Sequence, residues 1–204
     1  MKQIHARLPL LLLASFLLIF IWSGIAPKDR FTWYLEVAPA VIGGLILVRT
    51  YHTFRLTPLL YGLIWVHALI LVIGGHYTYA EVPLFNWLRD AYDLDRNYYD
   101  RLGHLAQGFV PAILAREILI RKQVVRGYGW LFFLVVSICL AFSAFYELLE
   151  FGMALATGTA ADAFLGTQGD VWDSQWDMLF ALMGAIISQL LLARIHDRQL
   201  RFFR

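Results

Sequence analysis

Long apolar segments recur along the chain and are separated by short stretches of polar and charged residues. An apolar segment of about 17 to 25 residues is long enough for a helix to cross the hydrocarbon core of a bilayer. The pattern therefore predicts an all-α, polytopic membrane protein, a bundle of about six transmembrane helices. We expect the spans over residues 8–26, 33–48, 58–75, 100–120, 128–155 and 173–195.

The first span resembles a signal peptide, because basic residues precede its apolar run. The run is long, however, and no small-residue cleavage site precedes Pro27, so we expect it to remain as an anchor. The second and fourth spans are less uniform, since charged residues and prolines interrupt them.

Composition supports the same fold class. The chain is 60% hydrophobic, against about 45–50% in soluble domains. At 204 residues we expect one integral membrane domain over 1–204.

The net charge of the chain is +2, which argues against a nucleic-acid partner, because such a partner requires a concentrated basic surface. Membrane lipids are the expected partners. The single cysteine, Cys139, lies in an apolar run and is interpreted as a small buried residue.

The distribution of charge predicts the orientation. With the N-terminus inside, all but five of the 17 lysine and arginine residues fall on the cytoplasmic side. Of the 15 acidic residues, only Glu117 and Asp197 fall there. Both distributions follow the positive-inside rule, so we expect a cytoplasmic N-terminus and C-terminus. We interpret Arg116 and Glu117 as interface anchors and His196 as a solvated residue.

Two outward loops stand out. Residues 75–99 carry apolar side chains at helical spacing with charges between them, which predicts a short helix lying in the membrane interface. Residues 157–172 are rich in glycine, alanine and aspartate, and the run 166–170 is typical of an ordered loop over a site.

Ionisable residues gather at the predicted outer ends of several spans. They occur as pairs three or four residues apart, a spacing that places both members on one helix face. We expect a single site, with these residues as candidate catalytic groups and metal ligands: Asp100, His104, Glu147, Glu150, Asp173 and Asp177. His76, at the outer end of the third span, is a further candidate metal ligand.

A cluster of acids at a membrane boundary requires compensation, because like charges repel and burial disfavours the ionised forms. Protons, a divalent metal, or Arg89 and Arg101 could supply it, and carboxylates with imidazole suit Zn, Mn or Fe. The alternative is structural, since acids such as Asp100 and Asp173 also stabilise helix N-termini. That alternative does not fit Glu147 and Glu150, which lie near a helix C-terminus, where the dipole disfavours anions.

Two further polar residues lie within spans. His67 is in the middle of the third span and is interpreted as a hydrogen-bonded packing residue. Glu36 lies just inside the second span, where we expect it to reach water or to pair with Arg30 or a neighbour.

Several runs resemble known families. The sequence is similar to the YjdF family of predicted bacterial inner-membrane proteins, a likeness that covers nearly the whole chain. It rests on GHYTY at 75–79, YDRLGH at 99–104, ELLE at 147–150 and GTQGDVWD at 166–173. The resemblance implies a multi-pass protein of the bacterial inner (cytoplasmic) membrane and brings no established activity.

A more distant resemblance is to the VanZ-like superfamily. Asp100-Arg101 with His104 fits its first element, Glu147 its second and Asp173 its third. Glu150 and Asp177 stand where that pattern has glutamine and asparagine, which adds negative charge. The resemblance implies that these positions form one site, with a role at envelope lipids or cell-wall precursors.

The sequence leaves three function classes open. The first is an outward-facing site that binds a cation or an envelope lipid head group, with hydrolysis or group transfer as its chemistry if it is an enzyme. The second is a proton- or metal-coupled transporter. The third is a non-catalytic structural or assembly subunit, whose acids only stabilise loops.

Overall fold

The computed structural model of the chain describes residues 2–158 and 162–203, with side chains over 7–158 and 164–202. Within these residues the secondary structure is entirely helical. The predicted loop over 157–172 therefore lies partly outside the described residues. The elements are α1 Lys2–Ser23, α2 Arg30–Thr50, α3 Pro58–Tyr77, η1 Tyr79–Glu81, α4 Pro83–Tyr92, α5 Tyr99–Arg121, α6 Tyr128–Thr157, α7 Asp162–Leu165, α8 Asp173–Leu200 and η3 Arg201–Phe203.

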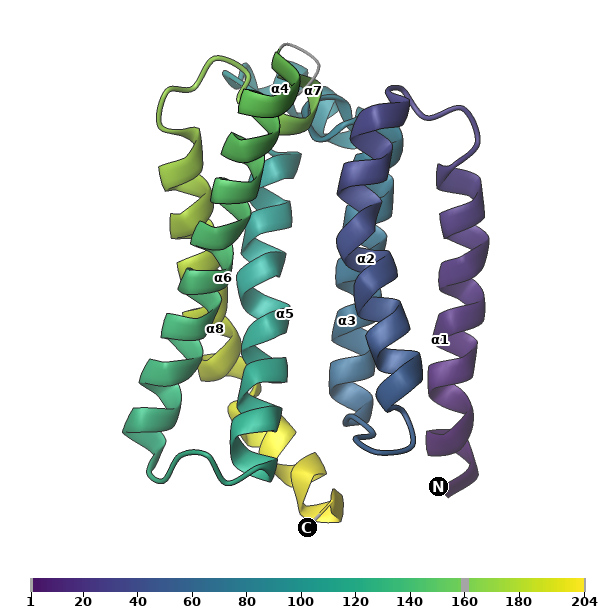
Figure 1. The fold of residues 1–204 in the computed structure, drawn as a ribbon, viewed down its shortest axis with the longest axis vertical. Coiled ribbons are helices and arrows are strands. Elements are labelled where there is room, and N and C mark those ends of the chain that lie inside the picture. The colour runs from purple at the N-terminus through teal and green to yellow at the C-terminus, as the bar shows by residue number, and fades with distance from the viewer. Residues whose placement is uncertain (1, 159–161, 204) are drawn as a thin grey trace.

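The long helices α1, α2, α3, α5, α6 and α8 coincide with the six predicted spans, with differences of a few residues at their ends. They run alongside one another, and both chain termini lie at one end of the bundle (Figure 1). The short helices α4 and α7 lie at the other end (Figure 1). These two ends are called the termini face and the α4 face below.

Local sequence explains where several helices begin. Asp29 caps α2 by accepting a 2.6 Å hydrogen bond from the backbone N–H of Thr32. Pro58 and Pro83 begin α3 and α4, at a position where the missing N–H costs nothing. Pro83–Tyr92 is the short amphipathic helix predicted between the third and fourth spans.

The helices pack in two groups joined through α3 and α5. Helices α1 and α2 pack on α3, while α6 packs on α5 and α8. The closest pairing is between α5 and α8. A Cβ atom on Gly108 would come within 1.8 Å of the Ala181 carbonyl oxygen, and one on Gly184 within 2.1 Å of the Leu105 carbonyl oxygen. Only glycine permits this approach, so Gly108 and Gly184 make the close α5–α8 contact possible.

Helix α5 is less apolar than the other long helices. Helices α2, α3, α6 and α8 are each long and apolar enough to cross a membrane, and α1 contributes a shorter apolar stretch over Arg7–Ser23. Helix α5 falls outside this group because it carries charges at both ends. More than half of its residues are buried between its neighbours, which remove those charges from lipid. The outward faces of the surrounding helices expose large apolar side chains, for example Phe133 and Leu190. The predicted polytopic helical bundle is confirmed.

Candidate functional site

A buried group of ionisable side chains lies at the α4-face ends of α5, α6 and α8. Its members come from these helices, from α2 and from the loops that cover them. We call it the acidic cluster, and it consists of Glu36, Arg96, Asp100, Arg101, His104, Glu147, Glu150, Asp170, Asp173 and Asp177. The structure thus brings together all six residues that the sequence pairs single out. Seven carboxylates face two guanidinium groups and one imidazole.

Two arginines organise one half of the cluster, the arginine half. Arg96 and Arg101 each donate a 2.6 Å hydrogen bond to the same carboxylate oxygen of Asp173. Arg101 also donates to Asp177, and both arginines reach Asp170. Arg101 and Asp177 are almost completely buried. Buried charges of opposite sign that share hydrogen bonds compensate one another, so these three aspartates are paired within the chain.

The other half is centred on His104 and is called the histidine half. The His104 Nδ1 atom lies 2.9 Å from Oε1 of Gln107, one turn further along α5. Its Nε2 atom lies 3.5 Å from Asp100 and 3.6 Å from Asp177, and Nδ1 lies 3.9 Å from Glu147. Two sets of three side chains have ligand atoms within 4.8 Å of one another: Asp100, His104 and Asp177, and His104, Glu147 and Glu150.

Two buried oxygen atoms of the cluster are left without a hydrogen-bond partner. They are Oδ2 of Asp100 and Oε1 of Glu147, and both residues are more than nine-tenths buried. The contacts of the Asp100 oxygen with Arg96 and Arg101 are long, at 3.5 and 3.6 Å. A buried carboxylate oxygen without a partner is costly, so these two atoms mark a place where a ligand or proton belongs.

Glu36 is a member of the cluster that the sequence interpretation missed. It is buried on α2, next to the α3 backbone at Gly75, and interacts electrostatically with Asp100 and His104. It neither reaches water nor pairs with Arg30, which bonds to the Gly24 carbonyl, so of the predicted alternatives only interaction with a neighbour fits. Only the packing of α2 against α3 reveals this placement.

Tyr79 connects Glu36 to the rest of the cluster. Its ring fills a slot between Gly74 of α3 and Gly103 of α5, where a Cβ atom would come within 2.5 and 2.8 Å of the ring. The buried side chain interacts with the Glu36 carboxylate. No periodic pattern points to Tyr79, because it lies in the short η1 turn.

Two sequence candidates lie elsewhere. His76 does not join either set of candidate ligands. Its Nδ1 atom is 3.0 Å from the Ser23 carbonyl, and its ring stacks on Trp22 with centroids 4.4 Å apart. Arg89, considered as a compensating charge, pairs with exposed Asp90 instead. Arg96 takes that role, although its position in an irregular loop gave no sequence signal.

Two loops close over the cluster and hold one another. The Gln168 side chain accepts a 2.8 Å hydrogen bond from the Asn97 N–H and donates a 2.9 Å bond to the Asn97 carbonyl. Arg96 donates to the Gly166 carbonyl, at 3.2 Å. The run 166–170 therefore covers the cluster in the described part of the loop, as an ordered loop over a site should.

A second buried charge network lies at the termini face. Glu117 accepts hydrogen bonds from the N–H and hydroxyl of Thr57 and from Arg121, and lies 3.0 Å from Nε2 of His196. The His196 ring in turn contacts Arg116. Glu117 and His196 are completely buried, so the interpretations as an interface anchor and a solvated residue are wrong. The network ties the α2–α3 loop to the ends of α5 and α8.

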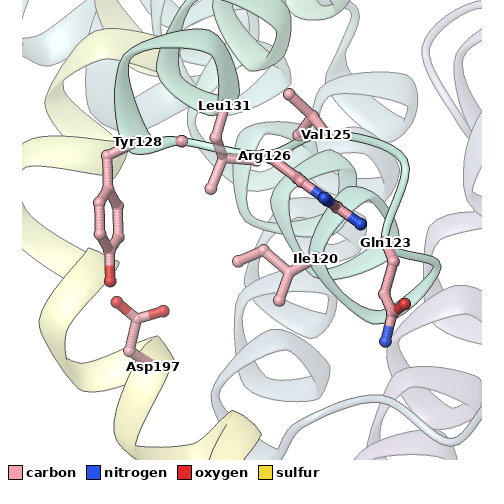
Figure 2. Close-up of a pocket in the computed structure, with 8 residues that line it drawn as sticks. Ile120, Gln123, Val125, Arg126, Tyr128, Leu131 and Asp197 are labelled. Atoms are coloured by element: carbon pink, nitrogen blue, oxygen red, sulfur yellow. The ribbon is translucent and has the colours of Figure 1, made fainter.

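A cavity of about 260 Å³ lies beside this network. Figure 2 shows Tyr128 and Asp197 on one side of it and Arg126 and Gln123 on the other. Asp197 is paired with Arg116 at 2.8 Å, so the cavity adjoins a compensated charge. It lies at the opposite end of α5 from the acidic cluster and has no part in that site.

Comparison with known proteins gives two matches and one absence. The family model described as "Predicted membrane protein (DUF2238)" matches residues 8–198. The chain is also 52% identical over 198 residues to "Inner membrane protein YjdF" of Escherichia coli (strain K12), which covers 96% of this chain and 95% of that protein. No solved structure matches the chain.

Proposed function

The chain belongs to the DUF2238 family of predicted membrane proteins. We propose that its acidic cluster binds a divalent cation and acts at the outward-facing surface of the inner membrane. It is a multi-pass protein of the inner membrane, as the apolar helices and its relative indicate. The orientation that the charge distribution predicts places the α4 face, and with it the acidic cluster, outside.

The imbalance of charge in the histidine half carries the proposal. Asp100, Glu147 and Glu150 lie around one imidazole, with which Glu36 also interacts electrostatically. The arginines hydrogen-bond to the other three aspartates and reach Asp100 only at 3.5 and 3.6 Å. Two of the carboxylate oxygens are buried and unpartnered. A divalent cation would supply both the missing charge and the missing partners.

The ligand types favour a transition metal. Carboxylate oxygens with one imidazole nitrogen suit Zn, Mn or Fe, and bundles build such sites from side chains of adjacent helices. Gln107 would orient the His104 ring, and Arg101 would fix Asp177, as supporting groups do around metal ligands. A metal so held would supply Lewis acidity for hydrolysis or group transfer on an envelope substrate.

A proton- or metal-coupled transporter is the second candidate. The observation in its favour is that the Ser143 and Ser188 hydroxyls are buried and unpartnered in the interior of α6 and α8. Against it, α5 and α8 are in close backbone contact at Gly108 and Gly184, and the buried Glu117 network lies at the far end of that contact. These features favour a site that opens to one face only.

The test is the metal content of the full chain, purified in detergent from metal-replete cells without chelator and measured by elemental mass spectrometry. We expect near-stoichiometric divalent metal, and its loss in Glu147→Gln/Glu150→Gln. The matched control is Asp90→Asn, which removes an exposed carboxylate on α4 and should keep the metal. Metal-free wild-type protein, or equal content in all three, would reject the cation.

A further inference from the structure

A second cavity lies at the α4 face, next to the acidic cluster. Its volume is about 390 Å³, and three loops line it: the α1–α2 connection, the segment from α3 into η1, and the loop after α7. Its lining residues are Lys28, Asp29, Thr78, Ala80, Glu81, Gly166 and Gln168. Because these segments are far apart in sequence, the cavity exists only in the folded bundle.

A single glycine separates this cavity from the cluster. A Cβ atom on Gly166 would lie 4.0 Å from the carboxyl carbon of Asp100, while Gly166 itself lines the cavity. Its φ of +63° and the hydrogen bond from Arg96 to its carbonyl hold the backbone in this position. A molecule in the cavity is therefore adjacent to the proposed cation ligands.

The cavity is lined by one cation, Lys28, and two carboxylates, of which Asp29 is already engaged as the cap of α2 and Glu81 faces Lys28. Lys28 Nζ lies 3.5 Å from Glu81 Oε2, with side chains 53% and 44% exposed. Such an exposed pair is worth little and is readily exchanged for ligand contacts. Glu81 is the fixed member, because Asn86 donates a 3.1 Å hydrogen bond to it. That bond, together with Lys28, lowers the pKa of Glu81 and keeps it ionised.

Apolar side chains flank the charged pair on both sides. Ile25 is three residues before Lys28 and 65% exposed, and Leu84 is three residues after Glu81 and 61% exposed. Trp22 and Trp87 are also exposed in the same segments, as expected for a membrane interface. A ligand with two opposite charges and an apolar tail matches this combination.

From this placement we propose that the cavity binds the phosphoethanolamine head group of a zwitterionic phospholipid in the outer leaflet. Lys28 contacts the phosphate, Glu81 accepts hydrogen bonds from the primary ammonium, and the acyl chains lie along the exposed apolar residues. The proposal rests on the proposed function in two respects: it takes the α4 face to be outside, and it makes this lipid the substrate that the cation site faces.

Binding is tested by native mass spectrometry of the full chain, incubated separately with phosphatidylethanolamine, phosphatidylcholine and phosphatidylglycerol of identical acyl chains. We expect phosphatidylethanolamine to be retained best. The quaternary ammonium of phosphatidylcholine has no proton to donate to Glu81, and phosphatidylglycerol has no cation. Lys28→Gln and Glu81→Gln should each weaken retention about tenfold, the size of one lost charge-assisted hydrogen bond.

Controls separate this result from the cation proposal. Asp90→Asn should retain the lipid, and so should Glu147→Gln/Glu150→Gln, since neither touches the cavity. Equal retention of all three lipids, or retention unchanged in both Lys28→Gln and Glu81→Gln variants that melt like wild type, would overturn the head-group proposal. Loss of metal with lipid selectivity intact in Glu147→Gln/Glu150→Gln is the result that both proposals predict, and metal-free wild-type protein that still selects phosphatidylethanolamine would reject the cation site alone. Melting temperatures accompany each measurement to show that the variants are folded.

The link between cavity and cluster has its own matched pair. Gly166→Ala and Gly169→Ala both place a side chain at a positive φ, but the Cβ at position 169 meets nothing within 4 Å. We expect phosphatidylethanolamine to change the protein's affinity for added Mn²⁺ in wild type and Gly169→Ala, and not in Gly166→Ala. An identical lipid effect in both glycine variants would show that the cavity and the cluster are not coupled through this wall.

Discussion

At the scale of single residues, the carboxylates of the acidic cluster are compensated differently in its two halves. In the arginine half, each aspartate has a guanidinium partner, and Asp173 receives hydrogen bonds from both arginines. In the histidine half, His104 faces several carboxylates, the arginines reach only Asp100 and only at 3.5 and 3.6 Å, and two buried oxygens lack hydrogen-bond partners. A purely structural cluster would compensate both halves alike. This difference supports the proposal that the histidine half binds a cation.

Replacing Arg101 tests the structural role of the arginine half. We expect Arg101→Met to lower the free energy of unfolding by about 3 kcal/mol, because it leaves the buried carboxylates of Asp173 and Asp177 uncompensated. The control Arg89→Met breaks an exposed pair with Asp90 and should cost less than about 1 kcal/mol. Unfolding in mixed detergent micelles measures both, and equal costs would contradict the assignment.

At the scale of helices, the contact between α5 and α8 positions the site. Gly108 and Gly184 let the two backbones touch, which brings Asp100 and His104 on α5 within reach of Asp177 on α8. Each helix also carries charges at its other end, where the Glu117 network fixes the register a second time.

Adding one methyl group tests this contact. Gly108→Ala would place a carbon 1.8 Å from the Ala181 carbonyl oxygen, so we expect a loss of about 3 kcal/mol or failure to fold. Gly152→Ala on α6 meets nothing within 4 Å and should be neutral or stabilising by up to about 1 kcal/mol. Comparable thermal stabilities of the two purified variants would refute the glycine seam.

The helices and the paired acids were predictable from the sequence because their signals are local. Apolar length gave the spans, and spacings of three or four gave the residues that share a helix face. Glu36, Tyr79 and Arg96 were not predictable, since each reaches the cluster only through tertiary packing of α2, η1 or a loop. His196 was misinterpreted because nearby arginines made its segment look solvated.

At the scale of the whole molecule, the distribution of charge and of apolar surface predicts how the protein is oriented in the membrane. The apolar girdle of the bundle separates the acidic cluster at one face from the Glu117 network at the other. Both termini lie at the face of the Glu117 network (Figure 1). The positive-inside rule predicts that this face lies in the cytoplasm.

Cysteine labelling tests this orientation. In a Cys139→Ala background, Asp90→Cys on exposed α4 should react with a membrane-impermeant maleimide in intact spheroplasts. Lys122→Cys, at the end of α5, should react only after lysis. The reverse pattern would place the acidic cluster inside and remove the outer leaflet from the account.

The most direct test of the cation site is pulsed EPR of the full chain loaded with Mn²⁺, which detects imidazole nitrogen bound to the metal. The account predicts nitrogen coupling in wild type and in His76→Gln, because His76 lies apart from the candidate ligands. It predicts that the coupling disappears in a folded His104→Gln variant. Coupling that survives in His104→Gln, or that is lost in His76→Gln, would contradict the site described for His104.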